Sequence, residues 1–252
     1  MYGDLAPWWP LISPPEDYVA EGDMVAALLA GADPAIQTVL ELGSGGGHVA
    51  SHLTGRFAMT LVDLSPAMLA ESTRLNPGCA HVVGDMRTVR LGRLFDGILV
   101  HDAIDYLVTD DEVAALATTI ETHLRPGGVA LLVPDHVTES FQPGTDWGGS
   151  DSPDGRGARY LEWTWDPDPD DTHVQTVYSF VLRSADGSVQ TATETHHFGL
   201  FSRQRWLDLI GGAGLSVTPV LEDTAEDRAA RTMFVAQKPL APQEQGGSGV
   251  LG

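Results

Sequence analysis

Residues 38–47 of the chain read Thr-Val-Leu-Glu-Leu-Gly-Ser-Gly-Gly-Gly, an apolar run that leads directly into a glycine loop. The run from Thr38 to Leu42 lies between Pro34 and the glycines, which predicts a short buried strand. Glycines at positions 43, 45 and 47 let the backbone turn sharply and approach a ligand more closely than any side chain would permit. The stretch therefore predicts a strand, a ligand-binding turn and the start of a helix.

Two acidic side chains at predicted strand ends extend this pattern. Asp63 follows the apolar run 60–62, about 20 positions after the loop, where a carboxylate can accept both hydroxyl groups of a ribose. Asp85 and Met86 follow the next predicted strand and offer a polar and an apolar contact that suit an adenine ring. The nicotinamide-dinucleotide fingerprint needs its third glycine at position 48, where this chain has His48. The three strand ends together are more specific than the glycine loop alone.

Strands and helices alternate along the first half of the chain. Strands are predicted at 38–42, 58–62, 80–83, 95–100 and 129–133, and helices at 15–31, 46–53, 65–75 and 109–124. Ser65 followed by Pro66 predicts one helix start, and a capping box from Thr109 to Glu112 predicts another. This alternation is typical of a parallel sheet that helices cover on both faces.

The pattern changes after Pro134. Residues 138–158 hold five glycines among aspartates, serines and prolines, which predicts a long mobile loop. Strands are then predicted at 160–165, 174–183, 189–199, 215–221 and 232–237, with a helix that Ser202 caps. Residues 1–15, rich in aromatic residues and prolines, are predicted to be neither strand nor helix interior but a strap, and residues 239–252 a disordered tail.

Composition limits the classes of partner. The chain of 252 residues has 14 Lys and Arg against 35 Asp and Glu, a net charge of −21. Nucleic acids and anionic membranes need a basic face, so neither is expected as a partner. The segment before Arg56 has no basic residue to serve a secretory signal, and no apolar run is long enough to span a bilayer. With Cys79 as the single cysteine, we expect a cytoplasmic protein without disulfides.

The glycine loop and the two acidic strand ends resemble the class I S-adenosylmethionine-dependent methyltransferases. Their first motif is an acidic residue followed by G-x-G-x-G, and Arg125-Pro126-Gly127-Gly128 is similar to their L-(R/K)-P-G-G stretch. The resemblance implies a Rossmann-like α/β fold with a seven-stranded sheet, helices on both faces and an antiparallel last strand. It implies S-adenosyl-L-methionine as the cofactor. The cofactor-binding residues that it implies are Glu41, Gly43, Ser44, Gly45, Gly47, Asp63, Leu64, Asp85, Met86 and His101.

The stretch from Glu194 to Ser202 narrows the resemblance. Its pattern E-x-H-x-x-x-L-F-S is similar to one in the aminosugar N,N-dimethyltransferases, small-molecule enzymes of the glycine N-methyltransferase-like group. In that group an antiparallel β layer inserted after the fifth strand covers the acceptor, so we expect such a layer here. Residues 134–137, Pro-Asp-His-Val, depart from the aromatic-rich sequence of the aminosugar enzymes, which leaves the identity of the acceptor open.

Ligands of open α/β sheets gather at the carboxyl ends of the strands, so the acceptor pocket is expected there, under the inserted layer and the strap. The candidate substrate contacts are Tyr2, Trp8, Trp9, Tyr18, Asp105 and His136. The candidate catalytic side chains are His136, the preferred base, His101 and Tyr106; a hydrogen bond to a loop would equally explain His101, and ring packing would equally explain Tyr106. His196 and His197 are expected on opposite faces of a strand. The segment 166–171 lacks the glycine that a calcium loop needs, and no metal is expected.

The sequence thus predicts a small-molecule methyltransferase that acts on nitrogen or oxygen by in-line displacement. A homodimer is one assembly that it permits. The alternatives are a non-catalytic S-adenosylmethionine-binding protein and, less favoured, a nicotinamide-dependent oxidoreductase. The expected division of the chain is a strap and helix at 1–35, a cofactor-binding core at 36–137, an inserted sheet at 138–201, a final helix and two strands at 202–238, and a tail at 239–252.

Overall fold

The strand that precedes the glycine loop, β1 (Thr38–Leu42), lies inside a seven-stranded sheet of the computed structural model, which describes residues 3–33, 35–223 and 230–240. The strand order is β10-β11-β5-β4-β1-β2-β3. The other strands are β2 (Ala58–Asp63), β3 (Ala80–Val83), β4 (Phe95–His101), β5 (Leu124–Val133), β10 (Ser216–Glu222) and β11 (Arg231–Gln237).

The winding of this sheet places a crevice beside the glycine loop. β1 pairs in parallel with β2 on one side and with β4 on the other, so the chain winds outward in two directions from this point. Ligands of such sheets bind outside the carboxyl ends of the strands at the reversal. β11 pairs antiparallel with β5, as the family resemblance implies.

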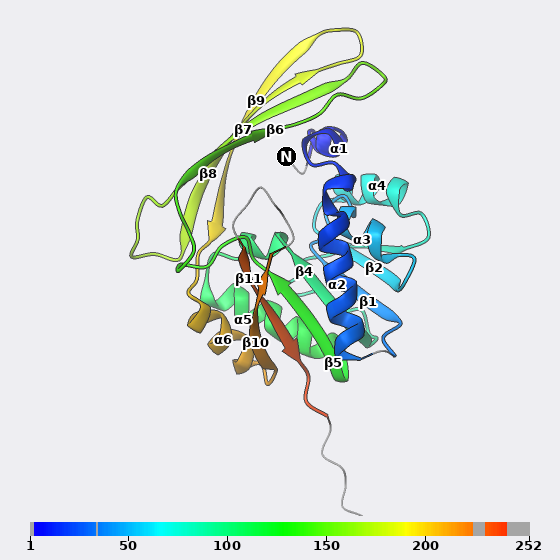
Figure 1. Ribbon diagram of the computed structural model, residues 1–252, viewed down its shortest axis with the longest axis vertical. Helices are drawn as coiled ribbons and strands as arrows, with labels where there is room; N and C mark the ends of the chain where they lie inside the picture. The colour runs from blue at the N-terminus through cyan, green and yellow to red at the C-terminus, as the bar shows by residue number, and fades with distance from the viewer. Residues whose placement is uncertain (1–2, 34, 224–229, 241–252) are drawn as a thin grey trace, which may run out of the picture.

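Helices cover both faces of the sheet (Figure 1). One face packs against α2 (Val19–Ala32) and α3 (His48–Leu53), and the other against α5 (Asp110–His123) and α6 (Arg203–Gly212). A further helix, α4 (Pro66–Leu75), packs against β2 and β3. Successive residues of β1 serve the two layers, because Val39 faces the α2 side and Leu40 the α5 side. The predicted fold class is confirmed.

Local sequence sets the helix starts as predicted. The Ser65 hydroxyl accepts a hydrogen bond from the Met68 amide at 3.1 Å at the start of α4. Thr109 and Glu112 form a reciprocal capping box at the start of α5. The boundary after α5 was predicted less well, because β5 begins at Leu124 instead of residue 129. Leu124 pairs with Phe95 and Val129 with Gly97, so the pairing of β5 with β4 has an irregularity between these two pairs. No local sequence pattern reveals it.

A second sheet, antiparallel and four-stranded, lies beyond the carboxyl ends of the parallel strands (Figure 1). We call it the roof; its order is β6 (Gly144–Gly148), β7 (Gly157–Trp165), β8 (His173–Arg183) and β9 (Val189–Gly199). The prediction of a loop over residues 138–158 was wrong, because this range holds β6 and the start of β7. β6 is an exposed edge strand rich in glycine, so its sequence has a loop's composition and its pairing with β7 determines its structure.

The N-terminal segment holds more helix than predicted, because two short helices precede Pro15, where the predicted helix begins. It forms the short helices η1 (Ala6–Trp8), α1 (Trp9–Ile12) and η2 (Pro15–Tyr18). Its prolines occupy first or second positions of these turns, where a helix needs no amide hydrogen from them. Trp8 packs with Ala158 and Phe180 of the roof, which joins this segment to the second sheet. A fourth short helix, η3 (Ala103–Tyr106), follows β4.

Among the described residues, no helix combines the length and apolar character of a membrane span. No cluster of three or more His, Cys, Asp or Glu side chains in this part of the chain is arranged to hold a metal ion. Tyr2 and residues 241–252 of the predicted tail lie outside the described residues.

Candidate active site

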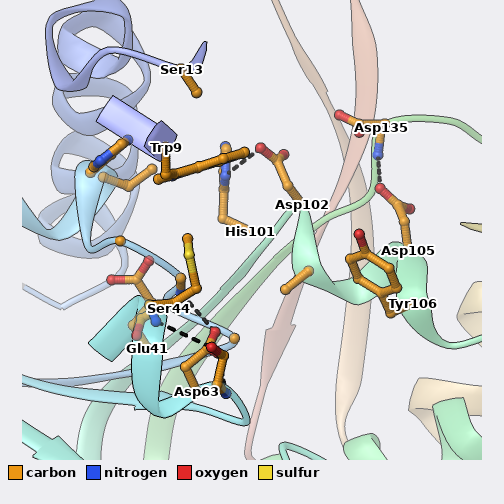
Figure 2. Close-up of a pocket in the computed structure, with 18 of the residues that line it drawn as sticks. Trp9, Ser13, Glu41, Ser44, Asp63, His101, Asp102, Asp105, Tyr106 and Asp135 are labelled. Atoms are coloured by element: carbon orange, nitrogen blue, oxygen red, sulfur yellow. Dashed lines mark hydrogen bonds and ion pairs between the residues drawn. The ribbon is translucent and has the colours of Figure 1, made fainter. Parts of the chain in front are cut away.

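One cavity of about 1140 Å³ lies between the carboxyl ends of the parallel strands and the roof. Its floor is the glycine loop, the strand ends carrying Asp63 and Asp85, and the segment from His101 to Leu107. Its walls include Trp9 and Tyr18 from the N-terminal segment, two of the predicted acceptor contacts. The roof contributes Tyr160, Glu162, Tyr178 and Phe198, none of which the sequence analysis identified. Figure 2 shows the labelled part of this lining.

The glycine loop is held in a left-handed conformation that favours glycine. Gly43, Gly45 and Gly47 have φ angles of 75°, 51° and 73°. The amides of Gly43 and Ser44 donate to the Val62 carbonyl at 2.8 and 2.9 Å, which fixes the loop to the end of β2. A Cβ atom at Gly43 would overlap the side chain of Ala103. The loop therefore brings bare backbone to the edge of the cavity.

Gly47 has a different role from the two glycines before it. It is absent from the cavity lining, and a Cβ atom there would overlap the side chains of Ser72 and Asn76. Asn76 donates to the Gly47 carbonyl at 2.8 Å. The structure therefore places Gly47 where α3 packs against α4, and Gly46 takes its place in the cavity lining.

Glu41 lies beneath the loop and is 3 % exposed. Its Oε2 atom is buried without a hydrogen-bond partner among the described residues, and so is the hydroxyl oxygen of Ser44. Burial raises the pKa of Glu41 to about 8. A buried carboxyl group with an unused oxygen at the cavity edge suits a ligand that carries a hydrogen-bond donor or a positive charge.

Asp63 and Asp85 occupy the strand ends as expected. Asp63 accepts the amides of Gly45 and Ser65 at 2.8 Å each, and burial raises its pKa. Each of its oxygens retains a second lone pair for a ligand hydroxyl. Asp85 is paired with Arg87, whose Nη2 atom lies 2.6 Å from Asp85 Oδ2. Arg87 lines the cavity too and was missed, although its position two residues after Asp85 makes the pair a local one.

The remaining implied cofactor contacts also lie at this edge. Met86 lines the cavity with its sulfur 3.8 Å from the position of a Cβ atom at Gly43, so it places apolar surface over the loop. Leu64 lines the cavity and is largely exposed. His48, the residue that breaks the dinucleotide fingerprint, lines the cavity with its ring stacked on Trp9 at 6.0 Å between centroids. Burial lowers the pKa of His48 to about 4, so its ring is neutral.

Arg231 of β11 is the centre of a buried ion network that the sequence analysis missed. Its side chain is 5 % exposed and bonds four carboxylates that come from four different elements or their ends. The nitrogen-to-oxygen distances are 2.6 Å to Glu222, 2.9 Å to Glu21, 2.9 Å to Asp102 and 2.8 Å to Asp135. The network therefore ties β10, α2, β4 and β5 to β11 at one wall of the cavity.

His101 is part of the same network. Its Nε2 atom lies 3.2 Å from Glu21 and its Nδ1 atom 3.1 Å from Asp102. Burial alone would lower the pKa of His101, but the two carboxylates outweigh it and raise the pKa to about 10. Arg231 Nη2 lies 2.8 Å from His101 Nε2, a contact that opposes protonation but is outnumbered by the two carboxylates. A pKa of about 10 favours the protonated ring at neutral pH, whereas a hydrogen bond from Arg231 needs a lone pair on Nε2 and favours the neutral ring.

Asp102 and Asp105 shape the cavity wall next to this ring (Figure 2). Asp102 has a φ angle of 53°, a strained conformation for a residue with a side chain, which His101 and Arg231 hold from two sides. Asp105 is buried; its Oδ2 atom accepts the Asp135 amide at 3.0 Å and its Oδ1 atom has no partner among the described residues. Burial, with a contribution from Asp135, raises the pKa of Asp105 well above its usual range.

The other predicted site residues lie partly inside and partly outside the main cavity. Tyr106 lines the cavity. Trp8 is buried between the N-terminal segment and the roof and is absent from the lining. His136 is exposed and stacks edge-on against Phe141 at 5.5 Å. It lines a small cavity of about 90 Å³ that shares lining residues, among them Asp105 and Glu162, with the main cavity. His196 is half-buried and His197 exposed, so these two histidines face opposite sides of β9 as expected.

Comparisons with known proteins agree with this geometry. Residues 39–128 match a family model described as a methyltransferase domain. The dTDP-3-amino-3,4,6-trideoxy-α-D-glucopyranose N,N-dimethyltransferase of Streptomyces venezuelae is 33% identical over 131 residues, 51% of this chain and 55% of that protein. The dTDP-3-amino-3,6-dideoxy-α-D-glucopyranose N,N-dimethyltransferase of Streptomyces fradiae is 28% identical over 204 residues, 80% of this chain and 79% of that protein. The match thus spans about half the length of the first relative.

A solved structure is similar over most of the chain. It is SAM-bound CalS10, an amino pentose methyltransferase from Micromonospora echinaspora involved in calicheamicin biosynthesis. The TM-score is 0.72 at 25% identity, over 88% of this chain and 91% of that one. The family match covers the sheet from β1 to the start of β5, and the structural match extends the likeness over most of the chain. The chain is therefore similar to methyltransferases over residues 39–128, and to a SAM-bound amino pentose methyltransferase over most of its length.

Proposed function

We propose that this protein transfers a methyl group from S-adenosyl-L-methionine to the amino nitrogen of a small sugar-like acceptor. The observation that carries the proposal is the cavity itself, because it joins the glycine loop and Asp63 on its floor to the aromatic and acidic roof. A cavity of about 1140 Å³ has room for two small ligands side by side, since typical sites for one measure roughly 300–1,000 Å³.

The residues on the floor fit the cofactor. Gly43 and Gly45 present bare backbone, and the unused oxygen of Glu41 suits the positively charged amino-acid part of the cofactor. Asp63 has lone pairs for the ribose hydroxyls, and Met86 offers an apolar surface to the adenine. The sulfonium of the cofactor would supply a methyl group that a nucleophile displaces in line. The task of the protein is to hold the acceptor nitrogen against that group.

The opposite part of the cavity fits a sugar that carries an amine. Tyr160, Tyr178 and Phe198 of the roof supply aromatic surface for the faces of a sugar ring. Asp105 and Glu162 lie in the same lining, where burial raises the pKa of both carboxyl groups, and an ammonium group beside them would favour their ionised forms. Relatives named as N,N-dimethyltransferases of amino sugars support nitrogen over oxygen as the nucleophile. We infer that the acceptor enters beneath the roof.

Calorimetric titration with S-adenosylhomocysteine tests the cofactor half of the proposal. Gly45→Val forces a side chain into a left-handed conformation (φ 51°), and such strain of about 1–3 kcal/mol should weaken binding roughly tenfold or more. Gly92→Val is the matched control, because Gly92 has a similar φ of 67° with open space around it outside the cavity. No binding by the unaltered protein, or equal binding by Gly45→Val, would contradict the assignment.

The alternatives predict different results in two further measurements. A non-catalytic binding protein would bind S-adenosylhomocysteine but transfer no labelled methyl group to any amino sugar in a screen. A nicotinamide-dependent oxidoreductase would bind NADH, which is visible as energy transfer from tryptophan to the reduced cofactor.

Mass spectrometry of the product counts the methyl groups transferred to each acceptor. Analytical ultracentrifugation of the full chain decides between a monomer and the homodimer that the sequence permits.

A further inference from the structure

Three side chains form a hydrogen-bonded chain from the cavity into the roof. The Tyr106 hydroxyl lies 2.7 Å from Nδ1 of His196, and Nε2 of His196 lies 3.0 Å from Oε2 of Glu194. Tyr106 belongs to η3 of the core, whereas His196 and Glu194 belong to β9 of the roof. Figure 2 labels Tyr106 among the residues that line the cavity. The chain therefore bridges the two sheets at the acceptor side.

The geometry defines the positions of the protons. A carboxylate accepts hydrogen bonds, so the proton of a neutral His196 ring lies on Nε2 and points at Glu194. Nδ1 is then an acceptor, and the Tyr106 hydroxyl donates to it. A phenol oxygen has two lone pairs besides its own hydrogen, and Tyr106 lines the cavity. Tyr106 can therefore accept one proton from the cavity while it donates its own to His196.

The surroundings keep this chain in place. Among the described residues, the titratable groups that face His196 are Tyr106 of η3, Tyr178 of β8, whose ring centroid lies 5.3 Å away, and Glu194 of its own strand. Phe198 packs edge-on against Tyr106 at 4.9 Å. The His196 side chain is 10 % exposed and that of Glu194 is 28 % exposed, so the chain leads from the cavity toward solvent.

We propose that Tyr106, positioned by His196 and Glu194, removes the proton that an acceptor amine carries into the site. The inference rests on the proposed function, because an alkyl ammonium has no lone pair for attack and its ordinary pKa lies near 10. In the step, the ammonium N–H bond breaks and its proton passes to the Tyr106 oxygen, while the Tyr106 proton passes to Nδ1 of His196. The products are a neutral amine, an intact phenol and an imidazolium that pairs with the Glu194 carboxylate.

The same route serves each round of a double methylation. A methylated amine leaves the transfer as an ammonium again, so a second transfer needs a second deprotonation at the same place. Between the rounds the His196 imidazolium releases its proton through the partly exposed Glu194. The competing base is Asp105, whose Oδ1 atom is buried, has no partner among the described residues and lies in the same lining. Asp105 and Tyr106 are neighbours on η3, whereas His196 belongs to β9, so substitutions of Asp105 and of His196 separate the two candidates.

The first test uses no acceptor. In the nitrogen NMR spectrum of ¹⁵N-histidine-labelled protein, we expect His196 to carry its proton on Nε2 and Tyr106→Phe to shift its Nδ1 resonance toward that of an unbonded ring nitrogen. His197→Gln is the control that assigns the neighbouring signal, because His197 is exposed on the other side of β9. A His196 protonated on Nδ1, or an Nδ1 signal unchanged by Tyr106→Phe, overturns the proposal.

The second test measures single-turnover methylation from pH 6 to 9, with dTDP-3-amino-3,4,6-trideoxy-α-D-glucose, the acceptor named for the Streptomyces venezuelae relative, as the probe. We expect His196→Gln to slow transfer roughly 10²-fold, the usual share of general base catalysis, with a rate that rises with pH more steeply than in the unaltered protein. Added imidazole should restore part of the rate to His196→Ala. S-adenosylhomocysteine affinity should stay unchanged in both variants and in His197→Gln.

The outcomes separate this inference from the proposed function. If Asp105→Asn shows the loss and His196→Gln keeps both rate and pH profile, Asp105 is the base and the relay is wrong. If the unaltered protein binds S-adenosylhomocysteine but methylates neither the probe nor the same amino sugar without its nucleotide, the proposed acceptor is wrong, and the NMR result alone decides whether the hydrogen-bonded chain exists. If it does not bind S-adenosylhomocysteine, the cofactor assignment is wrong.

Discussion

Glu41 affects both the stability of the ligand-free protein and, under the proposed function, its affinity for the cofactor. The side chain comes from β1, where an acidic residue interrupts an apolar run and is carried into the interior with it. Burial raises its pKa from an ordinary value of 4.5 to about 8, so the folded protein holds a neutral carboxyl group there at neutral pH. A positively charged ligand group would favour the ionised form. The residue thus costs stability when the site is unliganded and contributes affinity when it is liganded.

Glu41→Gln should therefore change how stability depends on pH. Between pH 4.5 and about 8 the unfolded chain has lost the Glu41 proton while the folded chain keeps it. The free energy of unfolding should then fall with rising pH by up to about 1.4 kcal/mol per unit from this group, and Glu41→Gln should remove that slope. Urea unfolding of the ligand-free protein at several pH values measures it.

The control for this measurement is Glu16→Gln, because Glu16 is also a glutamate but is exposed on η2. It should leave the slope unchanged. A Glu41→Gln variant with the same slope as the unaltered protein would show that the Glu41 carboxyl group is ionised when buried, and that another group compensates its charge.

At the scale of elements, the Arg231 network joins strands and a helix that are distant in the sequence. Glu222 lies directly opposite Arg231 in the antiparallel β10–β11 pair, and Glu21 projects from α2 on the neighbouring face. Asp102 and Asp135 follow β4 and β5 and complete the set. The last strands of the chain thereby position α2 at the cavity wall.

Arg231→Met should destabilise the protein by about 3–5 kcal/mol, because it removes the Arg231 cation from the fully buried Glu222. The double variant Arg231→Met with Glu222→Met should recover much of that loss, since both partners of the buried pair are then apolar. Urea unfolding of the two variants gives the comparison. Equal stability of the single and double variants would mean that the carboxylates at the strand ends, not Glu222, set the cost.

Elements and strand ends that depend on local chemistry were predicted from the sequence. The glycine loop, Asp63 and the caps at Ser65 and Thr109 follow from residues that lie close together in the chain. The parallel sheet followed because alternating strands and helices leave few other arrangements. These features were sufficient for the fold class and for the floor of the site.

Features that depend on contacts between distant segments were not predicted. Arg231 and Glu21 are 210 residues apart, and Tyr106 and His196 are 90 apart, so no periodicity or spacing could pair them. The edge strand β6 has a loop's composition and exists through its pairing with β7. The wall and the roof of the cavity are therefore properties of the tertiary structure, while its floor is a property of local sequence.

At the scale of the whole molecule, charge acts on whatever approaches the cavity. The chain carries a net charge of −21, and the cavity lining repeats the excess with nine aspartates and glutamates against two arginines. Both arginines are paired, Arg87 with Asp85 and Glu112, and Arg231 within its network. Such a field accelerates the approach of cations and slows that of anions. It favours the sulfonium of the cofactor and an ammonium on the acceptor, and it opposes a diphosphate.

The charge of the acceptor should therefore decide how capture responds to salt. We expect kcat/KM for a free amino sugar, which carries an ammonium, to fall as the ionic strength rises from about 0.01 to 1 M, because the Debye length shrinks from about 30 to 3 Å. For the same sugar linked to a nucleoside diphosphate, kcat/KM should rise over that range, because screening weakens the repulsion of the phosphates. Steady-state methylation of the two forms at constant pH measures both slopes. If the two slopes have the same sign, contacts inside the cavity outweigh the field of the molecule, and the preference for a cationic acceptor must be sought in Asp105 and Glu162 alone.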